Sequence, residues 1–233
     1  MKKYLYLLVP TIFLLIFIVF TIMVKTVDVH YEAIGNFKIG FHHFNYEVGE
    51  WVVRQNRMSS TKKISDLLLY VGIGISGIFA LIGIYQWIRR KSLLKVDYRL
   101  YLLAATYVFI AIAYLLFEII KVNYSPDLTE GLKCSYPSSH VFIGCSLFIV
   151  NIYTALEMLN LDEDKSWLKY IGYLATALIC VGIIYTRLLT LKHWATDIIG
   201  AILLILFISS LYIALFNKFF KVKKEEQVDG GIE

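Results

Sequence analysis

The stretch DIIGAILLILFISSLYIALF, residues 197–216, decides the fold, because only the first of its 20 residues is charged. A helix of about 20 mainly apolar residues is long enough to cross the hydrocarbon core of a bilayer. Shorter apolar runs occur in the cores of soluble proteins, but a run of this length is typical of a membrane span. We therefore read it as a transmembrane helix.

Five further runs of the same kind precede it. Of the 233 residues, 58% are hydrophobic and only 18% are charged, and the mean hydropathy is +0.66. The charged residues lie mostly between the runs, as in proteins whose solvent is lipid. The sequence therefore predicts an all-α polytopic membrane protein, a bundle of six transmembrane helices that forms one domain over residues 1–233. The predicted spans are residues 4–24, 66–88, 98–120, 138–159, 168–185 and 197–216.

The first run raises the alternative of a cleaved signal peptide, because Lys2 and Lys3 precede it. Its apolar stretch is longer than the hydrophobic region of a signal peptide, and no small-residue cleavage site follows. We therefore expect the run to be retained as a membrane anchor.

Basic residues set the expected orientation. They gather at residues 1–3, 89–99 and 218–224, which fall on one side of a six-span chain. Lys and Arg mark cytoplasmic loops, so both termini are expected in the cytoplasm of a multi-pass cell-membrane protein. The acidic loop 160–167 falls on the same side, but acidic residues count little in this rule. This pattern also explains the net charge of +5 without nucleic-acid binding.

Three segments are then expected outside the cell, at residues 25–65, 121–137 and 186–196. The first is long for a connection and has room for a small cap. Within it, residues 46–58 predict either a helix lying on the membrane surface, with Trp51 at headgroup depth, or a solvated loop. The pair His42-His43 has no third ligand at a suitable spacing, so we expect no metal site.

Polar residues from distant parts of the chain converge on this outer face. Because ionisable side chains near the hydrocarbon are expensive, a set of them at one membrane depth needs a reason. Cations attract an anion, a helix that starts near Pro137 offers free amides to it, and two histidines can divide nucleophile and acid roles. The candidates are Lys121, Ser138, Ser139, His140, Arg187, His193 and Asp197.

Each candidate alone has a structural explanation. Lys121 or Arg187 could be a side chain that reaches from a span end to the interface, and His140 or Asp197 could stabilise the start of a helix. Their joint occurrence on one face favours a site. With a spacing of four residues on one helical turn, the Asp197 carboxylate could hold a nitrogen of His193.

The order Pro137-Ser138-Ser139-His140 followed by Arg187-x5-His193-x3-Asp197 resembles the type 2 phosphatidic acid phosphatase (PAP2) superfamily, whose motifs are K-x6-R-P, P-S-G-H and S-R-x5-H-x3-D. The six-span layout is similar too. The resemblance implies that His193 is a nucleophile forming a phosphohistidine and that His140 protonates the leaving group. Asp197 would orient His193. The phosphate would be bound by Lys121, Arg187, Ser138 and Ser139, with no metal or other cofactor.

The first motif departs from this pattern. Lys121 is followed too soon by Ser125-Pro126, where an Arg-Pro pair is expected, and Lys133 is a possible substitute for the missing cation. The resemblance implies hydrolysis of a lipid phosphate monoester or pyrophosphate, such as phosphatidic acid, phosphatidylglycerol phosphate or a polyprenyl pyrophosphate. A catalytically weak lipid-phosphate-binding protein and a lipid phosphotransferase are the alternatives. A transporter is disfavoured, because the span centres carry almost no charge. Oligomeric state is left open.

Overall fold

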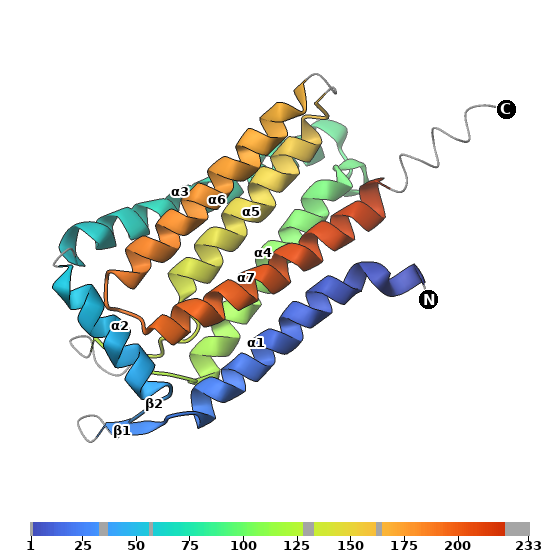
Figure 1. Ribbon diagram of the computed structural model, residues 1–233. Coiled ribbons are helices and arrows are strands. Elements are labelled where there is room, and N and C mark those ends of the chain that lie inside the picture. The colour runs from blue at the N-terminus through green and yellow to red at the C-terminus, as the bar shows by residue number, and fades with distance from the viewer. Residues whose placement is uncertain (1, 33–36, 56–57, 128–132, 162–164, 222–233) are drawn as a thin grey trace.

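The computed structural model describes residues 2–32, 37–55, 58–127, 133–161 and 165–221 (Figure 1). Within these residues the chain is almost entirely helical, with one small antiparallel pair of strands. The helices are α1 Leu8–Thr26, α2 His42–Arg54, α3 Met58–Arg90, α4 Tyr98–Ile120, α5 Ser139–Met158, α6 Trp167–Leu188 and α7 Ala195–Phe216, and the strands are β1 His30–Glu32 and β2 Phe37–Ile39.

All of these helices except α2 are long and apolar enough to span a membrane. The predicted all-α fold with six spans is therefore confirmed, and the bounds of α4 coincide with the prediction. Two helices are longer than predicted, which changes the setting of two polar residues. Asp66 lies inside α3 rather than at its start, and Arg187 lies in the last turn of α6 rather than in a loop.

Helix α5 is the centre of the bundle. Its spanning segment is 67% buried, against 22% or less for α1, α3, α4 and α6. It packs against α3, α4, α6 and α7, while α1 packs mainly on α7 (Figure 1). Side chains of the outer helices that face away from α5, such as Leu15 and Leu178, remain exposed, as suits a surface that meets lipid tails. The position of α5 therefore fixes where its polar first turn lies.

The predicted outer segment 25–65 forms a cap at one end of the bundle. It holds the β1–β2 hairpin, which the sequence analysis missed, and then α2 (Figure 1). Of the two alternatives for this region, the helix is found, but it starts and ends four residues earlier than residues 46–58 (42 and 54). Buried Asn45 holds α2 in place, because its amide donates to the Gly40 carbonyl (2.8 Å) and accepts from the Thr196 amide (3.1 Å).

Some expectations fall on parts of the chain that the structure does not describe. The acidic residues 162–164 and the end of the basic tail, residues 222–224, lie outside the described residues. The orientation of the bundle and the single-domain organisation over residues 1–233 stay predictions.

The tight contact between α7 and the segment before α5 gives a stability test. A Cβ atom added to Gly200 would lie 2.4 Å from the Tyr136 ring, which is 1% exposed and hydrogen-bonded through its hydroxyl to Thr21 (2.7 Å). We expect Gly200→Ala to destabilise the protein by about 1–3 kcal/mol, because the buried ring has to move. Thermal unfolding in detergent measures the change.

Gly74→Ala is the matched control, because an added Cβ there meets nothing within 4 Å. Its melting temperature should stay the same or rise slightly, since alanine favours a helix over glycine. Equal melting temperatures for the two variants would show that the Gly200 contact is not needed.

Candidate active site

The polar residues singled out in the sequence, except Lys121, meet where α6 ends and α5 and α7 begin. Figure 1 shows these three helix ends at the same end of the bundle. His140 lies in the first turn of α5, and Asp197 in the first turn of α7. Arg187 lies in the last turn of α6, His193 lies in the short connection between α6 and α7, and a hydrogen bond of 3.1 Å joins them. The fold therefore brings together the second and third motifs of the sequence, which are about 50 residues apart.

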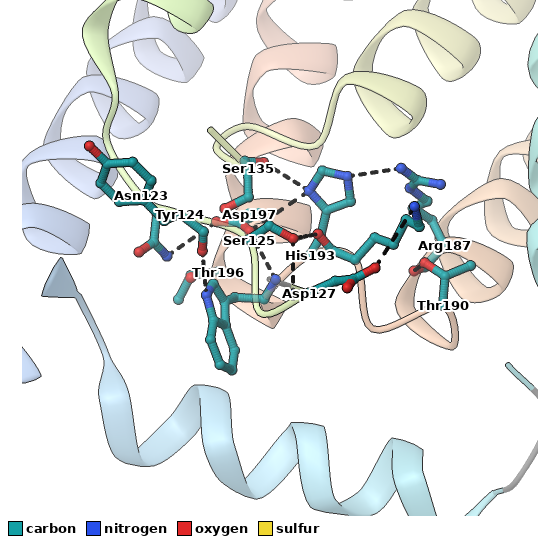
Figure 2. A network of polar contacts seen from close by, with 12 residues as sticks. Asn123, Tyr124, Ser125, Asp127, Ser135, Arg187, Thr190, His193, Thr196 and Asp197 are labelled. Carbon is teal, nitrogen blue, oxygen red and sulfur yellow. Dashed lines mark hydrogen bonds and ion pairs between the residues drawn. The ribbon is translucent and has the colours of Figure 1, made fainter. Parts of the chain in front are cut away.

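His193 is buried, and each of its ring nitrogens makes one hydrogen bond (Figure 2). Nδ1 lies 2.9 Å from the Ser135 carbonyl oxygen, and Nε2 lies 3.1 Å from an Arg187 Nη atom. A carbonyl can only accept and a guanidinium can only donate, so the network assigns the proton to Nδ1 and a lone pair to Nε2. That tautomer presents Nε2 as a nucleophile beside a cation.

Asp197 is completely buried and is held by hydrogen bonds (Figure 2). Its carboxylate accepts from the Trp194 amide (2.9 Å) and from the Asn123 side-chain amide (3.3 Å). The arrangement differs from the expected single helical turn, because His193 precedes the helix and Trp194 is its N-cap. The carboxylate is still 3.8 Å from His193 Nδ1, close enough to stabilise a positive imidazole ring, while Ser135 makes the nearer contact.

The start of α5 also differs from the prediction. The helix begins at Ser139, so Pro137 lies outside it, and the Ser138 amide is not free because it donates to the Asp197 carbonyl (3.0 Å). The first-turn amides of Ser139 and His140 have no acceptor among the described residues. They remain available at the positive end of the helix, where an anion is favoured.

Asp66 is the site residue that sequence reasoning missed. Its carboxylate lies 3.1 Å from His140 Nε2 and 3.9 Å from an Arg187 Nη atom. The available signal in the sequence is an acidic residue at the outer end of a predicted span, a position where an ionisable side chain needs a reason. Asp66 therefore adds a fourth helix, α3, to the α5, α6 and α7 that already contribute to the site.

The first motif is not part of this cluster. Lys121 is exposed at the end of α4 and lines a different cavity, together with Lys25 and Lys38. Ser125, in the place of the expected arginine, donates its hydroxyl to the Lys192 carbonyl (2.9 Å) and thus braces the connection that carries His193.

Two further lysines lie near Ser125. Lys133 is exposed and meets Ser125 through its backbone carbonyl, which accepts the Ser125 amide (3.0 Å). Lys192, directly before His193, is half-buried, and its ammonium lies 3.9 Å from the Asp127 carboxylate. Lys192 is therefore a basic side chain close to the site, and the sequence analysis overlooked it.

Several buried polar atoms of the cluster have no hydrogen-bond partner among the residues that the structure describes. They include the Ser135 and Ser138 hydroxyls, His140 Nδ1 and Arg187 Nε. Buried polar atoms without partners are uncommon, and those of Ser138, His140 and Arg187 belong to groups that can donate a hydrogen bond. With the α5 amides, these donors match an anion rich in oxygen atoms. Among the described residues no group of three His, Cys, Asp or Glu side chains is placed to hold a metal.

Comparison with known protein families agrees with the PAP2 resemblance of the sequence motifs. The family model described as the PAP2 superfamily matches residues 103–221, just over half of the chain, and the chain therefore belongs to this superfamily. Asp66 lies outside the matched region. No curated protein matches the sequence significantly.

A solved structure shares the fold. The crystal structure of a transmembrane PAP2-type phosphatidylglycerolphosphate phosphatase from Bacillus subtilis matches with a TM-score of 0.62 at 17% sequence identity. The match covers 91% of this chain and 97% of the Bacillus chain. It supports the six-span architecture over nearly the whole length of both proteins.

Burial lowers the pKa of His193 below its ordinary value of 6.5, because the charged imidazole would lose its water, and the nearby Asp197 carboxylate only partly opposes this. The folded protein therefore protonates His193 at a lower pH than the unfolded chain does, and the unfolded chain takes up a proton below about pH 6.5. Folding stability should fall as the pH drops through that range, by up to about 1.4 kcal/mol per pH unit from this residue.

The measurement is thermal unfolding in detergent from pH 8 to pH 5. His193→Gln should show a flatter pH dependence than the unaltered protein, and His30→Gln, at an exposed histidine in β1, should not. Parallel curves for all three proteins would mean that His193 is not held neutral by burial.

Proposed function

We propose that this protein is a phosphatase that hydrolyses a lipid phosphate monoester or pyrophosphate through a phosphohistidine on His193. The observation that carries the proposal is the convergence of unpaired donors beside a nucleophilic nitrogen. Arg187 Nε, the Ser138 hydroxyl and the α5 amides are available to phosphoryl oxygens, while His193 Nε2 has its lone pair on the same side as Arg187. Membership of the PAP2 superfamily supports phosphatase chemistry.

In the first step His193 Nε2 attacks phosphorus, a P–N bond forms and the P–O bond to the lipid breaks. The imidazole ring becomes positive, and the Ser135 carbonyl and the Asp197 carboxylate stabilise that charge through Nδ1. The Arg187 guanidinium, now hydrogen-bonded to Nε2, turns its donors to the phosphoryl oxygens. The Ser135 carbonyl and the Asp197 carboxylate are already in place beside Nδ1 before the substrate arrives, so the charge on the ring is stabilised with little reorganisation.

His140 supplies the proton that the leaving oxygen needs. Its Nε2 is held by Asp66 at 3.1 Å, which leaves the buried, unpartnered Nδ1 to face the leaving oxygen. Asp66 then acts as a positioning residue, because it fixes the ring and balances the imidazolium charge. In the second step His140 takes a proton from water, the water oxygen attacks phosphorus, and phosphate leaves from His193.

A lipid substrate follows from the position of the site. The site lies at one end of six helices that are long and apolar enough to span a membrane, which is where we expect lipid headgroups. The basic segments at the opposite end favour an extracytoplasmic site with both termini in the cytoplasm. Phosphatidylglycerol phosphate is one candidate, because the Bacillus protein of the same fold is described as a phosphatase of that lipid. Phosphatidic acid and polyprenyl pyrophosphates are the others.

The departure at Ser125 favours two alternatives. With one cation fewer at the phosphate, the protein could bind lipid phosphate with little turnover. It could also pass the phosphoryl group from His193 to a second lipid or a sugar, which differs from hydrolysis only in the acceptor of the second step.

Phosphate release by the purified full chain, in detergent and without added metal, tests the proposal. The panel is phosphatidic acid, phosphatidylglycerol phosphate and undecaprenyl pyrophosphate. We expect release from at least one of them and a loss of at least about 1,000-fold in His193→Ala, because the nucleophile is removed. His30→Ala, an exposed histidine outside the site, is the matched control and should keep full activity.

Release that persists in His193→Ala would overturn the phosphohistidine mechanism. Phosphate binding without release would support the binding alternative, and transfer of label to an added lipid acceptor would support the phosphotransferase. Sealed vesicles of known orientation, supplied with substrate from one side only, test on which face the site lies.

The variant Asp66→Asn tests whether Asp66 acts by supporting proton donation from His140 or only by stabilising the folded protein. We expect kcat to fall about 10-fold or more for an alkyl phosphate, whose leaving oxygen needs a proton. The fall should be much smaller for p-nitrophenyl phosphate, whose phenolate leaves without one. Glu157→Gln is the matched control, a carboxylate in α5 whose partner is Lys169 (3.5 Å), and both rates should be unchanged.

An equal loss for both esters would assign Asp66 a purely structural role. Combining Asp66→Asn with His140→Ala should add little further loss on the alkyl ester, because both changes remove the same proton transfer.

A further inference from the structure

A second cavity at the same end of the bundle collects lysines from three elements. It has a volume of about 270 Å³. Lys25 lies in the last turn of α1, Lys38 is the middle residue of β2, and Lys121 follows the last residue of α4. These positions are far apart in the sequence, so only the fold brings the three ammonium groups to one cavity.

The three positive charges lack a counterion within the described part of the chain. All three lysines are exposed, none makes an ion pair with another described residue, and no acidic side chain is among the described residues that line the cavity. The C-terminal ends of helices favour cations such as Lys25 and Lys121, but this does not explain Lys38, which lies in a strand. Three like charges around one cavity repel, and an anion placed among them removes that repulsion.

The wall that carries Lys38 is firmly attached to the end of α1. The amide of Phe41 donates to the Val27 carbonyl (2.9 Å), and the amide of His42 donates to the Asp28 carbonyl (3.0 Å). A Cβ atom at Gly40 would lie 1.6 Å from the Val24 carbonyl oxygen, so only glycine allows this approach. The cavity is thus built into the fold and does not depend on a loose loop.

The position of the cavity at the end of two spanning helices leads us to expect it at headgroup depth. Helix α1 has 19 residues and therefore rises about 28 Å, close to the thickness of the hydrocarbon core. Below the lysines, Ile22 on α1 is 57% exposed and Ile119 on α4 is 76% exposed, which leaves an apolar surface for acyl chains. Contact between the Phe17 and Phe117 rings, with centroids 5.6 Å apart, places α1 and α4 side by side.

An aromatic cluster lies between this cavity and the segment between α6 and α7 that carries His193. It separates the cavity from the candidate active site. The Phe37 and Tyr124 rings line the cavity and lie 5.5 Å apart, and the Trp194 indole donates to the Tyr124 carbonyl (2.7 Å). Neither His193 nor Arg187 is among the lining residues described.

We propose that this cavity is a second binding site, for the phosphate headgroup of an anionic lipid in the same leaflet as the catalytic site. Ammonium groups bind phosphate as point charges, so the site selects for negative charge and is sensitive to salt. This assignment gives Lys121 a role outside catalysis, and it does not depend on the proposed phosphatase activity.

Binding of dioctanoyl phosphatidylglycerol to the full chain tests the proposal, measured by titration calorimetry in the His193→Ala background to prevent turnover. We compare the triple substitution Lys25→Gln, Lys38→Gln and Lys121→Gln with the control triple Lys91→Gln, Lys95→Gln and Lys165→Gln, which removes the same charge from exposed lysines of other segments. We expect at least about a tenfold weaker affinity in the first triple only. Dioctanoyl phosphatidylcholine and inorganic phosphate should bind more weakly than phosphatidylglycerol to the protein with all lysines.

Equal affinities in the two triple variants would overturn the proposal. Inorganic phosphate binding as tightly as the anionic lipid would also overturn it and assign the cavity to a soluble anion. If the first triple variant does not fold, the single variant Lys38→Gln replaces it, and we expect its affinity for phosphatidylglycerol to be about threefold weaker. Because binding is measured without turnover, failure here leaves the phosphatase proposal untouched, and the reverse also holds.

Discussion

A completely buried carboxylate, that of Asp197, is the constraint around which the candidate site is arranged. A charge enclosed at the end of an apolar bundle is tolerated only when hydrogen bonds replace its water. Trp194 and Asn123 supply these bonds, and the backbone carbonyl of Asp197 accepts the amide of Ser138. Three segments are thus held to one residue, and the relative positions of His193 and the start of α5 follow from it.

The apolar part of the protein supplies rigidity rather than specificity. Helix α5 is surrounded by its neighbours, so its polar first turn stays at a fixed depth and direction. The cap formed by the hairpin and α2 is tied to the same place through Asn45, which bonds to both Gly40 and Thr196. Lipid chains cover the outer helices and require only that their side chains be apolar.

The candidate site carries less positive charge than the family motif implies. Ser125 replaces a cation with a hydroxyl that braces the connection carrying His193, and Lys121 lies in another cavity. Asp66 adds a negative charge next to His140 and Arg187. The proposed phosphate site would therefore depend on Arg187 and the α5 amides more heavily than the motif alone implies, with Lys192 nearby.

The sequence by itself determined the six apolar helices, because the length of an apolar run and the thickness of a bilayer are local properties. It also determined which histidines and which arginine belong together, because their spacing follows a known motif. Only the tertiary structure decided that Ser135 holds His193 Nδ1, that Asp66 joins His140, and that Lys121 leaves the site for a cavity shared with Lys25 and Lys38. These contacts join residues far apart in the chain, and they depend on how helices rotate and how loops fold over their ends, which no local pattern of residues specifies.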